Sequence, residues 1–189
     1  RRGMTARQFA PPFVRPLKVP VLITDLEHPR IAPGLDYING EIDKLAAKGR
    51  IGADETNRLK ALISGTTDKK DFADADWVIE AVFEELGVKQ QVFEDVEQYV
   101  ADDAIFATNT SSLSIEQIGA KLKHPERMVG FHFFNPVAVM PLIEVVKTAK
   151  TTDEALSTAM VTAAALRKNA VITTDTPGFV VNRILAKLL

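Results

Sequence analysis

Residues 108–144 read TNTSSLSIEQIGAKLKHPERMVGFHFFNPVAVMPLIE, and this stretch predicts two long strands joined by a short turn. The first apolar run covers residues 128–134 and leads into an Asn-Pro pair. The second apolar run covers residues 142–147. Runs of this kind are typical of strands that are buried on both faces of a sheet. Residues 137–141 between them are short enough to form the turn of a β-β unit.

The first run carries one histidine, His132, and the second carries one acid, Glu144. Each lies six residues from Ala138, so a turn centred on Ala138 would make them a cross-strand pair. An imidazole held by a carboxylate has a fixed tautomer and a stabilised charged form, as general acid–base catalysis requires. The alternative interpretation is that His132 is a hydrogen-bonded core residue and Glu144 is only its partner.

The composition describes a globular chain without a strong charge. Its 189 residues suffice for one domain, or for one domain with part of a second. Hydrophobic residues make up 46% of the chain and charged residues 25%, with a net charge of −2. There is therefore no general basic field to attract nucleic acid or an anionic membrane. No apolar run reaches the roughly 18 residues that a membrane span needs.

The chain has no cysteine and three histidines. The absence of cysteine excludes a disulfide scaffold and thiol catalysis, and it fits a reducing, cytoplasmic compartment. No group of His, Asp and Glu has metal-ligand spacing, so we expect no metal. The sequence begins Arg-Arg-Gly and ends inside the apolar run 180–189, and we expect both ends to be cut.

Predicted strands alternate with predicted helices along the chain. Strands are predicted at 21–25, 77–82, 104–107 and 170–174, and helices at 35–48, 54–63, 86–100, 114–122 and 151–166. The last two helices begin at Ser114 and Thr151, each with Gln or Glu three residues later, as in a capping box. This order predicts an α/β fold with a doubly wound, mostly parallel, Rossmann-type sheet.

Polar residues follow three of the predicted strands. They are Asp25, the segment from Ala81 to Glu84, and the segment from Thr108 to Ser111. In doubly wound sheets, ligands bind outside the carboxyl ends of the strands. The sequence therefore predicts a nucleotide site at this edge.

Three segments of the chain resemble the signature of the L-3-hydroxyacyl-CoA dehydrogenases. They are NTSSLSI (109–115), FHFFNP (131–136) with Glu144 behind it, and DTPGFVVNR (175–183). The resemblance extends from about Gly3 to the last residue. The family includes the dehydrogenase part of the multifunctional fatty-acid oxidation proteins. It implies an NAD-binding domain at residues 1–176 and the start of a helical C-terminal domain at residues 177–189.

The amino end departs from the family pattern. A dinucleotide fold begins with a strand and a Gly-x-Gly-x-x-Gly loop, and by the resemblance Arg1, Gly3 and Ala6 stand at the three glycine positions. Arginine does not suit the first position, which needs a tight turn without a Cβ. The preceding strand is missing, and its loss would leave the neighbouring strands as open edges. The alternative to a working pyrophosphate loop is a frayed or artificial terminus.

Two further expectations concern this half of the chain. Pro11, Pro12 and Pro16 each cost roughly 3 kcal/mol in a helix interior, so we expect the first helix to end near Ala10. Asp25 stands where an acid hydrogen-bonds the ribose hydroxyls and disfavours a 2′-phosphate, which predicts NAD rather than NADP. Asp25 could equally be a solvated turn residue or a helix cap.

At the reacting end, the resemblance implies four catalytic residues. His132 would take the hydroxyl proton, and Glu144 would orient His132. Ser111 and Asn182 would hydrogen-bond the substrate oxygen. Without the resemblance, Ser111 would be a turn residue before a helix and Asn182 a surface helix residue.

The resemblance also implies contacts with the nicotinamide half of the cofactor. It assigns them to Ala81, Glu84 and Lys89 of the EAVFEELGVK segment and to Asn109 and Asn135. Without it, Lys89 would be a solvated charge on a helix.

The function predicted in this way is hydride transfer from L-3-hydroxyacyl-CoA to NAD, giving 3-oxoacyl-CoA in fatty-acid β-oxidation. The resemblance also implies an acyl-CoA partner and, for a full-length protein, a homodimer. The alternatives are a related dehydrogenase of small hydroxy acids and a non-catalytic Rossmann-fold fragment. Because only the first turns of the helical domain are present, we expect this chain alone to be a poor catalyst.

Overall fold

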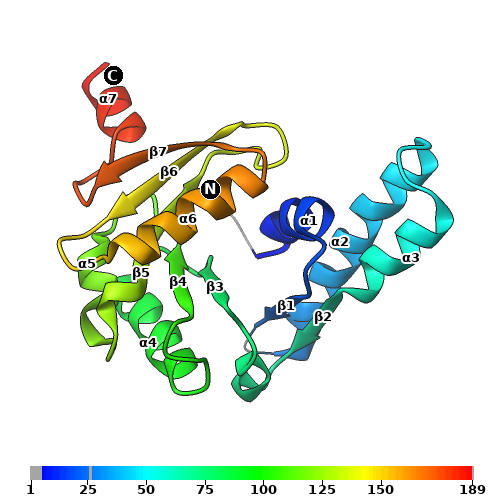
Figure 1. Cartoon of the computed structure of the whole chain (residues 1–189), viewed down its shortest axis with the longest axis horizontal. Helices are drawn as coiled ribbons and strands as arrows, with labels where there is room; N and C mark the ends of the chain where they lie inside the picture. The colour runs from blue at the N-terminus through cyan, green and yellow to red at the C-terminus, as the bar shows by residue number, and fades with distance from the viewer. Residues whose placement is uncertain (1–5, 26, 189) are drawn as a thin grey trace. The chain divides into compact units, whose positions relative to one another are not determined.

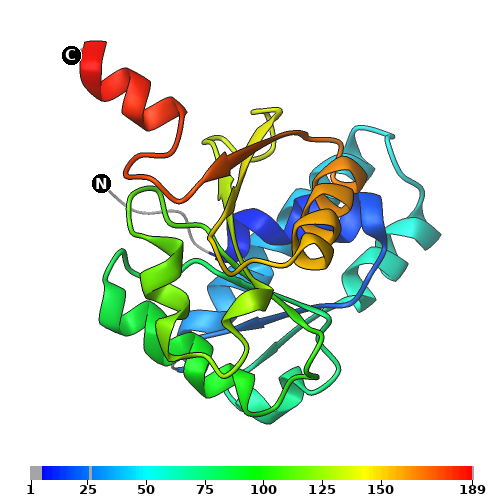
Figure 2. The same ribbon diagram turned by 60° about the vertical axis from the view of Figure 1, so that its left-hand side comes forward.

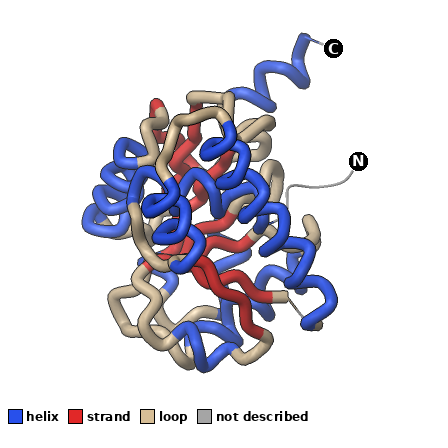
Figure 3. The backbone as a smooth tube through the Cα atoms, turned by 90° about the vertical axis from the view of Figure 1, so that its right-hand side faces the viewer, coloured by secondary structure: helices blue, strands red, loops and turns tan. Residues whose placement is uncertain are grey.

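The structure of the chain is a computed structural model that describes residues 6–25 and 27–188 (Figure 1). These residues form two compact units, Arg2–Asp71 and Phe72–Leu189. Helices and strands joined by loops make up the described chain (Figure 3), and each unit contains both. None of the described helices is both long enough and apolar enough to cross a membrane.

The first unit contains three helices around a short parallel ladder. Its elements are α1 (Ala6–Leu17), β1 (Val21–Thr24), α2 (His28–Ala47), α3 (Ala53–Ala61) and β2 (Ile63–Thr66). β1 and β2 pair in parallel, with Val21 opposite Ile63 and Thr24 opposite Thr66. A 3₁₀ turn, η1 (Lys69–Phe72), follows β2.

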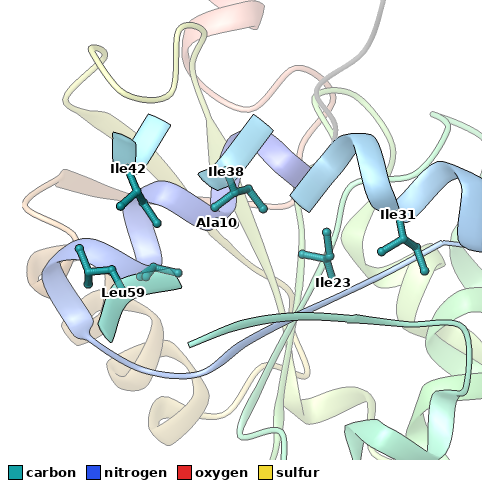
Figure 4. Close-up of a cluster of buried hydrophobic side chains, with 7 residues drawn as sticks. Ala10, Ile23, Ile31, Ile38, Ile42 and Leu59 are labelled. Carbon is teal, nitrogen blue, oxygen red and sulfur yellow. The ribbon is translucent and has the colours of Figure 1, made fainter. Parts of the chain in front are cut away.

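Seven buried apolar side chains hold this unit together (Figure 4). They come from the three helices and from β1: Ala10, Val14, Ile23, Ile31, Ile38, Ile42 and Leu59. Burying an aliphatic side chain of this size contributes about 1.5–3 kcal/mol. The cluster therefore fixes α1, α2 and α3 against the two strands.

The prediction that the first helix ends near Ala10 is wrong, because α1 continues to Leu17 through three prolines. Ala10 and Val14 lie one helical turn apart and are buried at 3% and 1% exposure. This apolar face packs against α2 and β1, and the helix forms although each interior proline costs about 3 kcal/mol. Tertiary packing here outweighs local propensity.

Two other boundaries of this unit differ from the prediction. Helix α2 starts at His28 rather than at residue 35, with Pro29 in its first turn, where a missing N–H costs little. Ile63, predicted at the end of a helix, begins strand β2. The Ile-Ser-Gly-Thr sequence of β2 is short and contains a glycine, and it forms a strand where it pairs with β1.

The second unit is built on a five-stranded sheet with the order β3-β4-β5-β6-β7. Its elements are β3 (Trp77–Glu80), α4 (Leu86–Glu97), β4 (Ile105–Thr108), α5 (Ile115–Ile118), η2 (Gly119–Lys121), η3 (Pro125–Arg127), β5 (Met128–Phe133), β6 (Leu142–Lys147), α6 (Asp153–Ala165), β7 (Asn169–Thr174) and α7 (Val181–Leu188). Helix α4 packs beside β3 and α5, and α6 packs against β5, β6 and β7. Helix α7 projects from the rest of this unit (Figure 2).

The predicted fold class is confirmed. Among the described strands, β5 and β6 form the antiparallel pair, and the other four pairings are parallel. No described strand precedes α1, and β1 and β3 belong to separate sheets, each at its edge.

Strand β5 is buried at every position, which explains its continuous apolar sequence. The rings of Trp77 and Phe131 meet edge to face with 5.1 Å between their centroids, and those of Phe131 and Phe133 do so at 5.3 Å. These contacts connect β5 to the edge strand β3 and fix the strand that carries His132.

The turn between β5 and β6 is held by a lysine from outside it. Lys168 donates from Nζ to the backbone carbonyls of Val137 and Met140 at 2.5 and 2.7 Å. Burial lowers the pKa of Lys168. The turn follows a cis peptide bond between Asn135 and Pro136.

Two predicted helix starts have different outcomes. Ser114 caps α5, and its side chain accepts a hydrogen bond from the backbone N–H of Gln117. Thr151 does not cap α6, because Thr152 takes that position and accepts from Ala155 N–H. Thr151 donates from its hydroxyl to the carbonyl of Met128, a bond to β5 that spacing alone does not predict.

We predict that Gly130→Ala destabilises the protein, because a Cβ at this position of β5 would lie 2.7 Å from Cβ of Val146 and 2.9 Å from Cδ1 of Ile115. Overpacking of this kind costs typically about 1–3 kcal/mol. Urea unfolding measures the change in the free energy of unfolding. Gly87→Ala in α4, where a Cβ would meet no atom within 4 Å, is the matched control and should be neutral or stabilising. A Gly130→Ala variant with the free energy of unfolding of the wild type would contradict the described packing of β5.

Candidate active site

His132 and Glu144 face each other across β5 and β6, as the spacing predicts. The antiparallel register pairs His132 with Glu144 and Gly130 with Val146. Nδ1 of His132 lies 2.8 Å from Oε2 of Glu144. Both residues are buried, at 4% and 1% exposure. Because an ionised carboxylate only accepts hydrogen bonds, this contact places the proton of neutral His132 on Nδ1.

The second oxygen of Glu144 anchors the start of α7. Oε1 accepts hydrogen bonds from the backbone N–H groups of Val180 and Val181, each at 2.9 Å. The first turn of a helix has unpaired N–H groups and carries a partial positive charge, which suits a buried carboxylate. Glu144 therefore joins the histidine to the final helix.

Two aromatic rings enclose the imidazole of His132. The centroid of its ring lies 4.7 Å from that of Phe134 and 5.7 Å from that of Phe179. Phe179 is buried at 2% exposure, and it adopts φ 49° directly after Gly178 at φ 74°. These two left-handed residues turn the chain so that Phe179 packs inward before α7 begins.

Among the described residues, the hydrogen bond of the His132 ring is made by Nδ1, to Glu144. With its proton on Nδ1, the neutral ring carries a lone pair on Nε2. A neutral imidazole with Nδ1 protonated is a base at Nε2. His132 thus has one basic nitrogen, Nε2, while the opposite ring nitrogen is bonded to the carboxylate of Glu144.

The loop after β4 brings Ser111 close to Asn182. Nδ2 of Asn182 donates to the backbone carbonyl of Ser111 at 3.4 Å. Asn109, two residues before Ser111, accepts a hydrogen bond at Oδ1 from the backbone N–H of Phe133 at 2.9 Å. The predicted residues of three sequence segments therefore meet at the carboxyl ends of β4 and β5.

Glu84 organises the same loop from the side of β3. Its Oε1 accepts hydrogen bonds from the hydroxyl of Thr110, from Ser111 N–H at 3.0 Å and from the hydroxyl of Ser112 at 3.2 Å. Burial alone would raise the pKa of Glu84, but the hydrogen bonds from Thr110 and Ser111 and the charge of Lys89 lower it below its ordinary value.

Lys89 is buried rather than solvated, at 1% exposure. Its Nζ lies 2.7 Å from Oε1 of Glu80 and 3.2 Å from Oε2 of Glu84. Glu80 also accepts from the hydroxyl of Thr108 at 2.7 Å. In this geometry Lys89 holds two carboxylates at the end of β3, and its direct contact with a cofactor stays a prediction.

The remaining predicted cofactor residues are dispersed. Ala81 follows β3 directly and is half-buried, and Asn135 is exposed at the end of β5. Ala6 opens helix α1, whereas Gly3 lies outside the described residues.

Asp25 follows β1 with a side chain that is 41% exposed, and its Oδ1 lies 3.9 Å from Nη1 of Arg30. A partly exposed carboxylate at the carboxyl end of a strand is the chemistry that binds a ribose diol. As an acceptor for two hydroxyl groups, Asp25 thus fits the adenosine ribose of a dinucleotide.

The prediction did not assign roles to Glu80, Thr110 and Asp175. Asp175 opens the third sequence segment, and its carboxylate accepts hydrogen bonds from Ser114, Ile115 and Glu116. Glu80 ends β3 and Asp175 directly follows β7, and an acid at the end of a strand is the signal that would have drawn attention to both. Within residues 6–25 and 27–188, no three His, Cys, Asp or Glu side chains gather closely enough to hold a metal ion.

Comparison with known proteins identifies relatives over nearly the whole chain. Residues 2–176 match the family model of the 3-hydroxyacyl-CoA dehydrogenase NAD binding domain. The chain is 40% identical over 169 residues to the fatty acid oxidation complex subunit alpha of Shewanella amazonensis and 39% identical over 166 residues to that of Acinetobacter baylyi. These alignments cover 89% and 88% of this chain but 24% and 23% of the relatives, so the chain spans about a quarter of their length.

Solved structures give the same result. The 3-hydroxybutyryl-CoA dehydrogenase of Escherichia coli matches with a TM-score of 0.90 and 33% identity, over 96% of this chain and 38% of that chain. The (S)-3-hydroxybutyryl-CoA dehydrogenase of Ralstonia eutropha matches with a TM-score of 0.90 and 30% identity, over 96% and 64% of the two chains.

We predict that Glu84→Gln lowers the free energy of unfolding at pH 7 and that this difference narrows toward about pH 3. The pKa of Glu84 in the folded state lies below its ordinary value of 4.5. The carboxylate therefore stabilises the fold above that pH, and the contribution is lost as the pH falls through the lower folded value. Urea unfolding at both pH values measures the difference.

The control for this measurement is Glu85→Gln, next along the chain. Glu85 makes no capping hydrogen bond with its side chain. Its variant should follow the wild type at both pH values. A Glu84→Gln difference that is equal at pH 7 and pH 3 would contradict the arrangement around Glu84.

Proposed function

The chain belongs to the family of 3-hydroxyacyl-CoA dehydrogenase NAD-binding domains, and from this membership we propose that it oxidises L-3-hydroxyacyl-CoA to 3-oxoacyl-CoA in fatty-acid β-oxidation. The observation that carries the proposal is the buried pair of His132 and Glu144. Oxidation of a secondary alcohol needs one base for the hydroxyl proton and a hydride acceptor beside the carbon.

His132 acts as the base in this proposal. Its Nε2 takes the hydroxyl proton, and the imidazolium that forms keeps its Nδ1 proton bonded to Glu144. The carboxylate of Glu144 already contacts the imidazole before the proton is transferred. It therefore stabilises the imidazolium without any group having to reorient. In the reverse direction the imidazolium returns the proton to the carbonyl oxygen.

Ser111 and Asn182 bind the substrate oxygen. Asn182 uses one hydrogen of Nδ2 on the carbonyl of Ser111, which fixes the direction of the other hydrogen. The hydroxyl of Ser111 is a second neutral donor. Two neutral donors beside an imidazolium stabilise an oxygen whose negative charge grows only in the transition state.

When bound, NAD supplies the acceptor for the hydride. Asp25 would hold the adenosine ribose through its hydroxyls and disfavour a 2′-phosphate. Glu84, Asn109 and Asn135 would line the nicotinamide half, with Ala81 leaving space beside it. Asn109 accepts a hydrogen bond at Oδ1 from Phe133 N–H, which fixes its side chain beside β5.

The proposal extends to an acyl-CoA thioester as the substrate and to a homodimer as the assembly. The name of the curated relatives describes a subunit of a fatty acid oxidation complex, which supports a fatty-acid-derived substrate and an oligomeric assembly. A cytoplasmic location is proposed as well, supported by the reducing compartment that the cysteine-free sequence fits.

The test measures NADH oxidation by the purified chain with acetoacetyl-CoA, together with NADH binding by fluorescence. His132→Ala should lower kcat by about 10²- to 10⁴-fold, the usual contribution of a general base, with NADH affinity changed less than about twofold. Glu144→Gln should also lower kcat, because a neutral amide does not balance the charge on the imidazole.

The chain offers a matched control in a second His–Glu pair. Nδ1 of His124 lies 3.1 Å from Oε1 of Glu126, with both side chains about 40% exposed. His124→Ala should leave kcat unchanged. Turnover of free acetoacetate at the rate of acetoacetyl-CoA would assign the enzyme to small hydroxy acids, and NADH binding without any turnover would favour a non-catalytic module.

A further inference from the structure

We propose that Asp175 is a positioning residue for the reaction, which holds the loop of Ser111 and the segment leading into α7 in one fixed register. The inference rests on the proposed function for its kinetic part. Asp175 directly follows β7, outside the residues that contact substrate or cofactor in that proposal.

The carboxylate of Asp175 accepts three hydrogen bonds from the start of α5. Oδ2 accepts from the hydroxyl of Ser114 at 2.7 Å and from Glu116 N–H at 2.9 Å. Oδ1 accepts from Ile115 N–H at 3.0 Å. Helix α5 has only four residues and cannot stabilise itself, so these bonds set where it begins.

The backbone of Asp175 is fixed independently of its side chain. Its N–H donates to the carbonyl of Lys147 at 3.1 Å, which continues the ladder between β6 and β7. Asp175 therefore fixes the loop relative to the edge of the sheet. Ile115 and Asp175, which make this contact, lie 60 residues apart in the sequence.

A second carboxylate holds the other end of the same loop. Glu84 accepts from Thr110, Ser111 and Ser112, three consecutive residues. Asp175 accepts from the next group, residues 114–116. The loop with Ser111 is thus suspended between one carboxylate after β3 and one after β7, the two outer strands of the sheet.

The segment from Asp175 to Asn182 is fastened at its far end to the reacting groups. Val180 and Val181 donate to Glu144, and Asn182 donates to the carbonyl of Ser111. Loss of the anchor at Asp175 would let the segment and the loop move against each other. The positions of Ser111 and Asn182 relative to His132 would then be less well defined.

This arrangement predicts a particular kinetic signature. Ser111 and Asn182 meet the substrate oxygen, whereas NADH is bound largely by other residues, so the defect should appear in kcat rather than in the affinity for NADH. A displacement of about 1 Å in a reacting group can cost up to roughly 10²-fold in rate. We expect Asp175→Ala to lower kcat about 10- to 100-fold.

The experiment compares Asp175→Ala and Asp175→Asn with Asp153→Ala. Asn keeps one oxygen for the N–H groups and can donate to the hydroxyl of Ser114, so its kcat should lie between those of wild type and Ala. Asp153 is the control, an exposed acid in the first turn of α6, which Thr152 caps. Its variant should retain the wild-type kcat.

Amide hydrogen exchange supplies a readout that needs no turnover. In Asp175→Ala, exchange should accelerate at Ile115 and Glu116 and also at Val180 and Val181, with the β5 amides unchanged. If the wild type shows no turnover, the proposed function fails, and the exchange at Val180 and Val181 still decides whether Asp175 positions the segment.

Two outcomes would overturn the inference. One is acceleration at Ile115 and Glu116 alone, which would make Asp175 a local helix cap. The other is an Asp175→Ala variant with the wild-type kcat although exchange is accelerated at all four amides. If the Ala variant does not fold, the same comparison is made with Asp175→Asn, for which wild-type kcat and exchange would likewise refute the role.

Discussion

The buried carboxylate of Glu144 is the group on which the geometry of the site depends. At 1% exposure, an ionised carboxylate is stable only if its oxygens are hydrogen-bonded. Glu144 satisfies this condition with His132 on one oxygen and with Val180 and Val181 on the other. The same charge therefore fixes the tautomer of the imidazole and the start of α7. Neither partner can be removed without leaving a buried charge undersatisfied.

Three other carboxylates, at the ends of β3 and β7, also accept hydrogen bonds that hold nearby segments. Glu80 and Glu84 share Lys89 after β3, Glu84 reaches the loop after β4, and Asp175 reaches that loop from β7. Backbone N–H groups that have no ladder partner beyond the strands are thus paired with side chains. These hydrogen bonds give the loop a defined shape.

The sequence predicts the second unit better than the first, for physical reasons. Strands β5 and β6 are local neighbours, so burial and the short turn between them suffice to place His132 opposite Glu144. Strand β2 exists because of β1, far from it in sequence, and helix α1 survives its prolines because Ala10 and Val14 reach the apolar cluster. Such nonlocal effects leave no periodic pattern. For the same reason Lys89 looked solvated on its helix, while Glu80, which pairs with it, lies on a strand.

The distribution of hydrogen bonds also explains the polarity of the reacting centre. The carboxylates around it are committed to backbone N–H groups, hydroxyls, Lys89 and the imidazole. Among the described residues, the groups proposed to meet the substrate are the Nε2 lone pair of His132, the hydroxyl of Ser111 and one amide hydrogen of Asn182. A fixed charge in that place would favour either the alkoxide or the protonated alcohol and would slow one direction of the reaction. Neutral donors beside a single base suit the interconversion of an alcohol and a carbonyl, because they stabilise the oxygen most where its charge is only partial.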